Sequence, residues 1–278
     1  MLSFAKNNYT MIVDVVRERN VTDAICKMKN AALHGARGFD LHLSCLEEPY
    51  RNTESIRKII TSVNLPTMAL NYSTRYDNSG IEETEEERVA LLKAAIDAGV
   101  SCIDMQAYTY NRECIQKFDT DKATPDMVFA HKNPREVCLD EAALAKQKAL
   151  IDYAHERGCE VLISCHTHEF LNADEMVCLA KLLKARGADV LKFVGDHCDT
   201  DEQLAENFRG MLALKRELGM NIHYHNNGIK GKITRIMNPM LGAYLVFCSD
   251  GYNPSSNISQ MELKNIVTLL DQFDKAML

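Results

Sequence analysis

One strand–helix–strand unit decides the fold of this chain: residues 161–194 read VLISCHTHEFLNADEMVCLAKLLKARGADVLKFV. The runs 161–166 and 190–194 are short and rich in Val, Leu, Ile and Phe, which is typical of buried strands. Between them, apolar residues recur at helical spacing; Asn172 precedes this stretch as an N-cap and Gly187 follows it as a stop signal. Two strands joined by a helix predict parallel pairing through a right-handed crossover.

The same alternation runs along the whole sequence. Further strands are expected at 11–16, 39–46, 67–72, 102–108, 222–225 and 244–248, with helices between them, for example at 85–98 and 260–277. Eight strands in ~250 residues fit a closed (β/α)8 TIM barrel, so we predict an α/β protein with one barrel domain over residues 1–278. A doubly wound open sheet is the alternative, but it usually carries a glycine-rich phosphate turn, and no G-x-G-x-x-G or G-x-x-x-x-G-K-[ST] occurs.

One segment breaks the alternation. Residues 109–138 follow the fourth predicted strand, contain Pro125 and Pro134, and show no clear helix or strand pattern. Loops of more than ~12–15 residues are uncommon and often functional. We therefore expect an extended loop here, either as a cover over an active site or as a surface addition that contacts a neighbouring subunit.

Composition excludes several functional classes. The 278 residues are 46% hydrophobic and 26% charged, as in an ordinary globular protein, and the net charge of −7 argues against nucleic-acid binding. No apolar run reaches the ~18–20 residues that span a bilayer, and the start, MLSFAKNNYTMIVDVV, does not resemble a secretion signal. The ten cysteines include no C-x-x-C pair, which favours reduced thiols and a cytoplasmic location.

Polar side chains are expected to gather where the predicted strands end. In a (β/α)8 barrel the functional residues lie at the C-terminal ends of the strands, and side chains two residues apart share a face. The polar residues that share a face in this way are Asp40, His42 and Ser44; Asp104 and Gln106; Ser164, His166 and His168; and His223 and His225.

Lys192 is the most informative candidate because it stands alone in an apolar strand. Burial disfavours the charged ammonium and makes the neutral amine available to attack a carbonyl as a Schiff-base nucleophile. The alternative is a lysine that reaches solvent from the strand end. His166 ends the preceding strand, and neighbouring strands lie ~5 Å apart. Lys192 and His166 are therefore expected to serve one substrate, with Lys192 on its carbonyl carbon and His166 moving a proton.

The paired histidines support a different interpretation. His166 and His168, and likewise His223 and His225, present two imidazoles on one strand face, and such clusters can bind Zn²⁺. A metal-dependent barrel hydrolase, whose activity chelators would abolish, is therefore an alternative. No H-E-x-x-H motif occurs, and strand histidines are often structural, so we expect no metal.

Four short motifs follow one another at the predicted strand ends: SCH at 164–166, ADVLK at 188–192, GKITR at 231–235 and SNISQ at 256–260. They resemble the S-x-H, A-D-hydrophobic-x-K, G-x-hydrophobic-S/T-R and S-x-P-G-Q motifs of the type I 3-dehydroquinate dehydratases, with the last proline and glycine replaced. The resemblance runs from residue 11 to about residue 271, without rearrangement of the strand order.

The resemblance implies a role for each matching residue. Lys192 would form an iminium with the substrate ketone, while His166 would remove the adjacent proton and then protonate the leaving hydroxyl, in a syn loss of water. Arg235 would clamp the substrate carboxylate, helped by Ser256 and Gln260. The implied reaction converts 3-dehydroquinate to 3-dehydroshikimate, in the shikimate pathway of aromatic amino acid biosynthesis.

The resemblance also implies the partners of this chain. The substrate would be a small anionic keto-acid, no cofactor would be needed beyond the covalent Schiff base through Lys192, and a homodimer is expected. No nucleic-acid or membrane partner is expected. An anionic substrate that enters an acidic protein needs local positive charge. We expect Lys192 and Arg235 to supply it.

Three departures from the family pattern concern substrate binding and the base. The family's second strand reads E-x-R-x-D where this chain has DLHLS at 40–44, so Asp40 and His42 take the places of an acid and an arginine. Tyr72 lies where the family carries an arginine after the third strand. Gln106 replaces the glutamate that orients the histidine, and a neutral amide does not stabilise an imidazolium. If that missing carboxylate limits the rate, Gln106→Glu should raise activity.

These observations favour a Schiff-base lyase, and other functions stay open. A class I aldolase would use the same lysine to break a carbon–carbon bond. The metal-dependent hydrolase comes next, followed by a non-catalytic homologue that binds a ligand.

Overall fold

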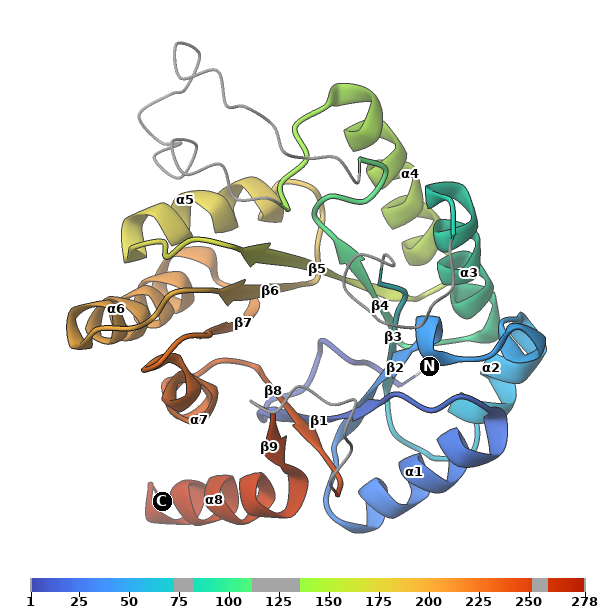
Figure 1. The fold of residues 1–278 in the computed structure, drawn as a ribbon, viewed down its shortest axis with the longest axis horizontal. Helices are drawn as coiled ribbons and strands as arrows, with labels where there is room; N and C mark the ends of the chain where they lie inside the picture. The colour runs from blue at the N-terminus through green and yellow to red at the C-terminus, as the bar shows by residue number, and fades with distance from the viewer. Residues whose placement is uncertain (1, 73–82, 112–135, 252–259, 278) are drawn as a thin grey trace. The chain divides into compact units, whose positions relative to one another are not determined.

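The computed structural model describes residues 2–72, 83–111, 136–251 and 260–277. Over these residues, eight strands each precede a helix along the chain, and a short ninth strand lies before the last helix (Figure 1). The chain forms two compact units: Met1–Asp104, Tyr153–Glu160 and Val246–Leu278 make up the first, and Met105–Asp152 and Val161–Leu245 the second. Each unit is described by itself.

The first unit contains parallel strands in the order β4-β3-β2-β1-β8-β9, of which β4 belongs to it only up to Asp104 and ends in the second unit. Their bounds are Met11–Val16 for β1, Gly38–His42 for β2, Thr67–Leu70 for β3, Cys102–Gln106 for β4, Leu245–Ser249 for β8 and Met261–Glu262 for β9. The helices are α1 at Val21–Leu33, α2 at Thr53–Ile60, α3 at Glu85–Ala98 and α8 at Leu263–Ala276. Strands β1 to β4 and β8 are buried along their whole lengths, so they form the core of this unit.

The second unit contains the parallel strands β5 at Glu160–Thr167, β6 at Val190–Gly195 and β7 at Asn221–Asn226, with β6 in the middle. Helix α4 at Glu141–Glu156 precedes β5, and each strand is followed by a helix: α5 at Ala173–Lys184, α6 at Asp201–Leu218 and α7 at Thr234–Met240. The strand–helix–strand unit predicted at 161–194 is therefore present as β5–α5–β6, with the parallel pairing expected from its sequence.

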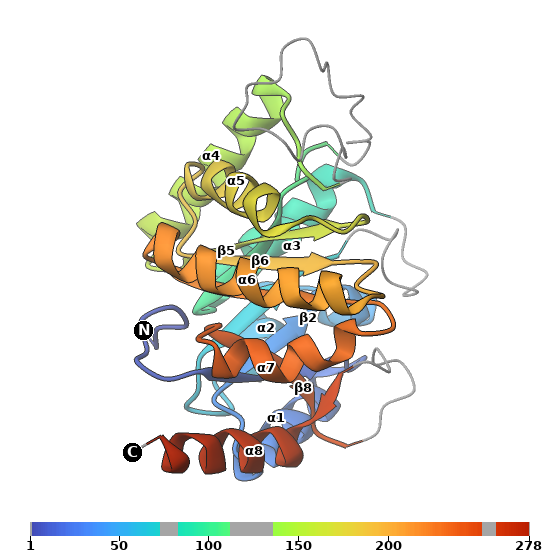
Figure 2. The same cartoon turned by 90° about the vertical axis from the view of Figure 1, so that its left-hand side faces the viewer.

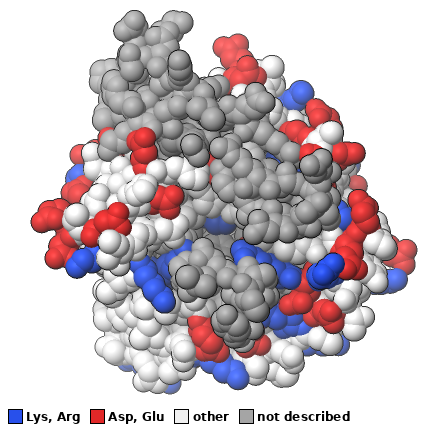
Figure 3. Space-filling view, in the orientation of Figure 1, with Lys and Arg blue, Asp and Glu red and all other residues white. Residues whose placement is uncertain are grey.

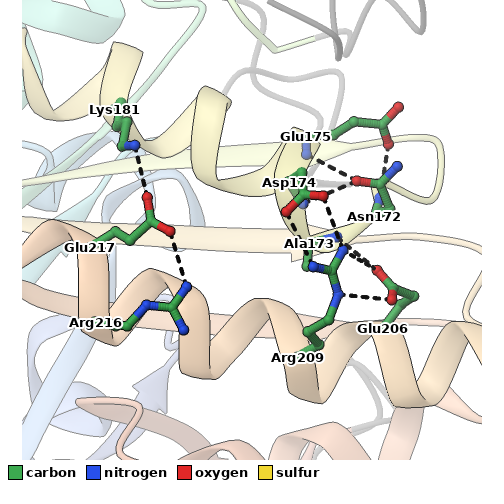
Figure 4. Close-up of polar contacts among 9 residues, drawn as sticks. All are labelled: Asn172, Ala173, Asp174, Glu175, Lys181, Glu206, Arg209, Arg216 and Glu217. Carbon is green, nitrogen blue, oxygen red and sulfur yellow. Dashed lines mark hydrogen bonds and ion pairs between the residues drawn. The ribbon is translucent and has the colours of Figure 1, made fainter. Parts of the chain in front are cut away.

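Helices α5 and α6 lie side by side and are joined by polar contacts (Figures 2 and 4). Asn172 caps α5: its side-chain oxygen accepts from the backbone N–H groups of Asp174 and Glu175, both at 3.0 Å. Arg209 on α6 donates to Asp174 at 3.2 Å, and Lys181 donates to Glu217 at 2.8 Å. These contacts join α5, the crossover helix between β5 and β6, to its neighbour α6.

Most of the predicted elements occur where the sequence pattern places them, and β1 and α3 have the predicted bounds. Several predicted ends were wrong. The third and fourth strands, expected at 67–72 and 102–108, stop at Leu70 and Gln106. The second strand stops at His42, because Leu43–Cys45 forms a 3-10 turn closed by a hydrogen bond from Leu46 N to Leu43 O at 3.1 Å; Ser44 is therefore not on the strand. The last helix begins at Leu263, because the two residues before it pair with β8 as β9.

The predicted loop at 109–138 lies largely outside the described residues, so neither proposed role for it is tested, and a single domain stays a prediction. Within the described part of the chain, none of the helices combines the length and apolarity that a membrane crossing requires. On the face in Figure 3, Asp and Glu side chains are interspersed with Lys and Arg side chains.

Candidate active site

Lys192 lies on the middle strand of the second unit, with polar residues beside it on both neighbours. The strand register pairs Lys192 with Ser164 on β5 and with His223 on β7. The lysine is only 6% exposed, and Leu191 and Phe193 on either side of it are fully buried. Since alternate residues of a strand share a face, these three polar side chains lie on one face at one level of the sheet.

His166 lies on that same face, one strand away and one level further along. It pairs with Val194, two residues beyond Lys192. The spacing of strands and the rise per residue put about 8 Å between the Cα atoms of His166 and Lys192. Both side chains are long enough to reach a small molecule between them. The structure therefore brings the two residues of the predicted catalytic pair to one place.

A carboxylate that the sequence did not reveal orients His166. Glu136 is fully buried, and its Oε2 accepts from the backbone N–H of His166 at 3.0 Å and lies 2.8 Å from Nδ1 of the ring. A carboxylate acceptor at Nδ1 favours the tautomer that carries its proton there and leaves the lone pair on Nε2. His166 is thereby presented as a base.

Glu136 is held in place because both flanks of residues 112–135 are fixed beside the end of β4. The Arg186 guanidinium donates to Ala107 O at 3.0 Å and to Cys138 O at 2.6 Å. The Cys138 N–H also donates to Ala107 O, at 3.2 Å, and Gln147 donates to Thr109 O at 2.8 Å. No motif spacing in the sequence connects Glu136 with His166, so only the fold reveals this contact.

Gln106 ends β4 in the same unit and is fully buried. The following residue, Ala107, donates its N–H to Ser164 O at 2.8 Å, which places the end of β4 beside the strand that carries His166. Gln106 therefore lies at the expected edge of the sheet, while the carboxylate on Nδ1 of His166 belongs to Glu136.

Arg235 is positioned by a tight turn between β7 and α7. The Thr234 hydroxyl accepts from Asn226 N at 3.0 Å and donates to Gly231 O at 2.6 Å. A side chain on Gly231 would overlap the Asn226 carbonyl, so this position requires glycine. Arg235 is 7% exposed, donates through Nη2 to Asn227 Oδ1 at 2.9 Å, and burial lowers its pKa to about 10. It remains a cation at neutral pH.

His223 and His225 form a buried pair. Nε2 of His223 lies 2.7 Å from Nδ1 of His225, and Nδ1 of His223 lies 2.7 Å from Leu245 O. Burial lowers the pKa of His223 to about 3, and burial with the nearby Arg235 cation holds the pKa of His225 well below its usual range. Both rings are therefore neutral at physiological pH. In the described ranges, no three His, Cys, Asp or Glu side chains are grouped as a metal site.

The remaining candidates belong to the first unit. Asp40 and His42 are buried on β2 and form an ion-pair contact of 3.2 Å between Oδ2 and Nε2. Tyr72 packs near His42, with 5.9 Å between ring centroids. Gln260 lies directly before β9. Ser256 falls outside the described residues. The first unit thus places Asp40, His42 and Tyr72 close together, and their contact with a substrate stays a prediction.

A strand lysine, a histidine oriented by a carboxylate and a buried arginine, arranged on alternating strands and helices, define an enzyme of the (β/α)8 class. Comparison with protein families gives the particular family: the model of type I 3-dehydroquinase matches residues 13–277. The chain belongs to this family, whose members are hydro-lyases. The resemblance seen in the sequence motifs is confirmed.

Solved structures with a similar fold include 3-dehydroquinate dehydratases. The 3-dehydroquinate dehydratase of Geobacillus kaustophilus has a TM-score of 0.75 at 13% identity, covering 98% of this chain and 93% of that chain. The type I enzyme of Clostridium difficile has a TM-score of 0.73 at 14% identity, covering 98% and 95%. The enzyme of Enterococcus faecalis has a TM-score of 0.73 at 12% identity, covering 98% and 99%. No curated protein sequence matches the chain. The predicted TIM-barrel fold is confirmed.

Proposed function

We propose that the chain is a Schiff-base lyase that dehydrates 3-dehydroquinate, or a closely related cyclic β-hydroxy keto-acid, by syn elimination. The observation that carries the proposal is the placement of Lys192: it is buried on β6, and His166 lies one strand away on the same face. Family membership supports the reaction class. The pathway would then be the synthesis of aromatic amino acids from shikimate.

The residues divide the chemistry between them. The neutral amine of Lys192 attacks the substrate ketone, and loss of water gives an iminium, which makes the neighbouring C–H bond acidic. Nε2 of His166 takes that proton, and the electron pair moves into the iminium to give an enamine. His166 then returns its proton to the β-hydroxyl, which leaves as water. Hydrolysis of the conjugated iminium releases the product and regenerates Lys192.

Glu136 and Arg235 serve the charged stages of this reaction. The Glu136 carboxylate stabilises the imidazolium that His166 becomes after it takes the proton. Arg235 binds the substrate carboxylate, because the guanidinium is buried and remains charged. Asp40, His42, Tyr72, Gln260 and Ser256 are proposed to contact the rest of the substrate.

The proposed substrate-binding residues include fewer cations than the family pattern has, which changes the groups that the substrate contacts. Where the family has arginines, this chain has His42 and Tyr72, so hydroxyl groups on the substrate meet an imidazole and a phenol. No cofactor is needed, because Lys192 itself supplies the electron sink. A homodimer is proposed from the family resemblance alone.

Reduction with borohydride tests the function. Wild-type protein incubated with 3-dehydroquinate and sodium borohydride should gain a covalent adduct that peptide mass mapping places on Lys192. Lys192→Met should gain none and should lose activity by at least about 10³-fold, since the covalent step is removed. Lys181→Met is the matched control, because that lysine is exposed and pairs with Glu217 on the surface.

The outcomes separate the proposals. Formation of 3-dehydroshikimate together with an adduct on Lys192 supports the lyase. An adduct without dehydration, but with carbon–carbon cleavage of a keto-acid, would identify an aldolase. Absence of an adduct with every cyclic keto-acid tested would overturn the Schiff-base mechanism.

A further inference from the structure

We infer that His168 and Asp196 form a positioning pair that fixes Glu136 against His166 and connects the base with Arg235. This inference rests on the proposed function for the role of His166. It concerns residues that the S-x-H motif does not include, because His168 lies beyond that motif.

The contacts form a continuous chain within the second unit. Glu136 presents Oε2 to His166 and Oε1 to His168, whose Nε2 lies 3.9 Å away. On its other side, Nδ1 of His168 lies 3.5 Å from Oδ2 of Asp196. The two carboxylates therefore bracket one imidazole ring, and the first of them also holds the proposed base.

The chain continues from Asp196 to the proposed carboxylate-binding residue. Oδ1 of Asp196 accepts from the Asn227 amide at 2.9 Å. The carbonyl oxygen of the same amide accepts from Nη2 of Arg235, also at 2.9 Å. One side-chain amide thus links the acid that contacts His168 to the buried guanidinium.

Charge explains why His168 suits this position. The neighbouring carboxylates, Asp196 first and then Glu136, raise the pKa of His168 to about 9, and the His168 contact lowers the pKa of Asp196. The ring is consequently an imidazolium at neutral pH. Within the described part of the chain, His168 faces Glu136 from the segment before α4 and Asp196 after β6, and Glu136 also contacts His166 on the strand of His168.

The consequence is that Glu136 shares its negative charge between two rings. Its Oε1 faces the His168 imidazolium, so Oε2 orients His166 with only part of the charge of the carboxylate. Without the His168 cation, the whole charge of Glu136 would act on the imidazolium that His166 forms when it takes the proton. His168 therefore keeps Glu136 aligned and moderates its effect.

Three variants test this role. His168→Asn and Asp196→Asn remove the cation and its anchor, while His197→Asn is the matched control. His197 lies beside Asp196 in the sequence, is exposed, and has φ of 59°, a conformation that asparagine tolerates. We expect His168→Asn and Asp196→Asn to lower kcat about tenfold with KM changed by less than about twofold, since proton transfer is affected.

The pH profile distinguishes positioning from a structural role. In His168→Asn, the pH at which kcat falls on the acid side should move up by about one unit, because Glu136 then stabilises only the His166 imidazolium. In Glu136→Gln, the additional change His168→Asn should cost nothing further, since both act through one carboxylate. A profile equal to that of His197→Asn, or additive losses in the double variant, would overturn the inference.

Nuclear magnetic resonance on the free protein separates this inference from the proposed function. The ring signals of His168 should titrate with a midpoint near pH 9 in wild type, and the midpoint should fall in both Asp196→Asn and Glu136→Gln. A midpoint near the ordinary value of 6.5, unchanged by these substitutions, would refute the bracketed imidazolium even if Lys192 forms its adduct. If no adduct forms but the titration is as expected, the proposed function fails and the placement of His168 stands.

Discussion

The negative charge that faces His166 comes from Glu136, which lies thirty positions earlier in the chain. Its carboxylate accepts from both the ring and the backbone N–H of the histidine, so it fixes the ring orientation as well as its tautomer. The negative charge beside the His166 ring therefore does not have to come from Gln106 at the end of β4. This assignment changes what is expected of a substitution at Gln106.

Gln106→Glu should leave kcat unchanged or reduced. The site already contains a carboxylate on His166, and the substitution adds a second charge at a position that is fully buried. Burial of a charge without a cationic partner costs about 1–3 kcal/mol or more, so the free energy of unfolding in urea should fall by about this amount. Steady-state kinetics and urea titration of the same preparation measure both effects. A higher kcat with unchanged stability would show that the neutral side chain of Gln106 limits proton transfer by His166 even though Glu136 is present.

Single residues also show what a sequence can and cannot reveal about a site. Lys192 stands out because a cation in an apolar strand is unusual, and His166 and Arg235 stand out because they fall at strand ends within motifs. Glu136 gives no such signal, since its partner is distant in sequence and it lies at the end of a stretch without periodicity. Its role depends on tertiary hydrogen bonds that no local pattern encodes.

The helices and strands of the second unit are tied together at the end of β4 by Arg186. Its guanidinium donates to carbonyl oxygens on both sides of residues 112–135 and to the Gln147 side chain at 3.0 Å. A bidentate cation is well suited to hold two chain segments side by side. Arg186 thus holds Cys138, two residues after Glu136, beside the end of β4.

Arg186→Ala should therefore lower both stability and kcat. Loss of hydrogen bonds from a charged group is expected to reduce the free energy of unfolding by about 2–3 kcal/mol. The carboxylate of Glu136 should lose its alignment, so kcat at saturating substrate should fall by about tenfold or more.

A cap substitution in the other unit supplies the control. Asn52 caps α2 by accepting from Ser55 N at 2.9 Å, and Asn52→Ala should cost about 1 kcal/mol. Its kcat per folded molecule should equal that of wild type. If the two variants lose kcat equally, the effect of Arg186 is one of general stability and not of Glu136 placement.

At the level of elements, periodicity and caps predict the interior of each strand and helix better than its ends. The capping box of Thr84 and Glu87 makes the start of α3 visible in the sequence, and Gly99 marks its end. The end of β2 depends on a 3-10 turn, and β9 is only two residues long. Such short elements form because a neighbouring strand or turn accepts their hydrogen bonds, so the sequence pattern does not predict them.

Each of the two units buries a titratable group whose ionisation opposes folding. In the first, Asp14 on β1 is fully buried; it accepts from Asp250 N at 2.5 Å and lies 3.7 Å from Lys27 Nζ. Burial nevertheless raises the pKa of Asp14 to about 7. In the second, burial lowers the pKa of His223 to about 3. Both groups favour the neutral form in the folded chain.

The two groups have opposite effects on stability as the pH changes. A carboxyl whose pKa is raised in the fold binds a proton more tightly there, so the contribution of Asp14 is greatest below pH 3.8 and is lost as the pH rises through about 7. A histidine whose pKa is lowered contributes above pH 6.5 and loses that contribution as the pH falls toward 3. The raised pKa of His168 adds a contribution below pH 6.5 that disappears as the pH rises through about 9.

Asp14→Asn isolates the first of these effects. The amide avoids ionisation, and its oxygen can still accept from Asp250 N, so the variant should gain stability relative to wild type as the pH rises from 4.5 to 7.5. Thermal unfolding of both proteins at the two pH values measures this difference. A difference in Tm that stays constant between pH 4.5 and 7.5 would contradict a buried, protonated Asp14.

For the whole molecule, the regular alternation of strands and helices was enough to predict the (β/α)8 class, and four motifs in order were enough to indicate the family. Alternation is a global signal, repeated eight times, so errors at single ends do not obscure it. The polar chain from Glu136 to Arg235 is a tertiary feature that five side chains from separate places in the sequence make together. Sequence patterns therefore predict the fold and single out Lys192 as a candidate. The charged contacts around His166 can be seen only in the folded structure.

The position of Glu136 has a consequence for how related chains are sorted. Gln106 stands at the position where the resemblance places the orienting acid. Within the folded unit, Glu136 instead presents a carboxylate to Nδ1 of His166, the side that an orienting acid requires. Selection on such a site acts on where the charge lies in the fold. A residue from a different position in the sequence can therefore supply that charge.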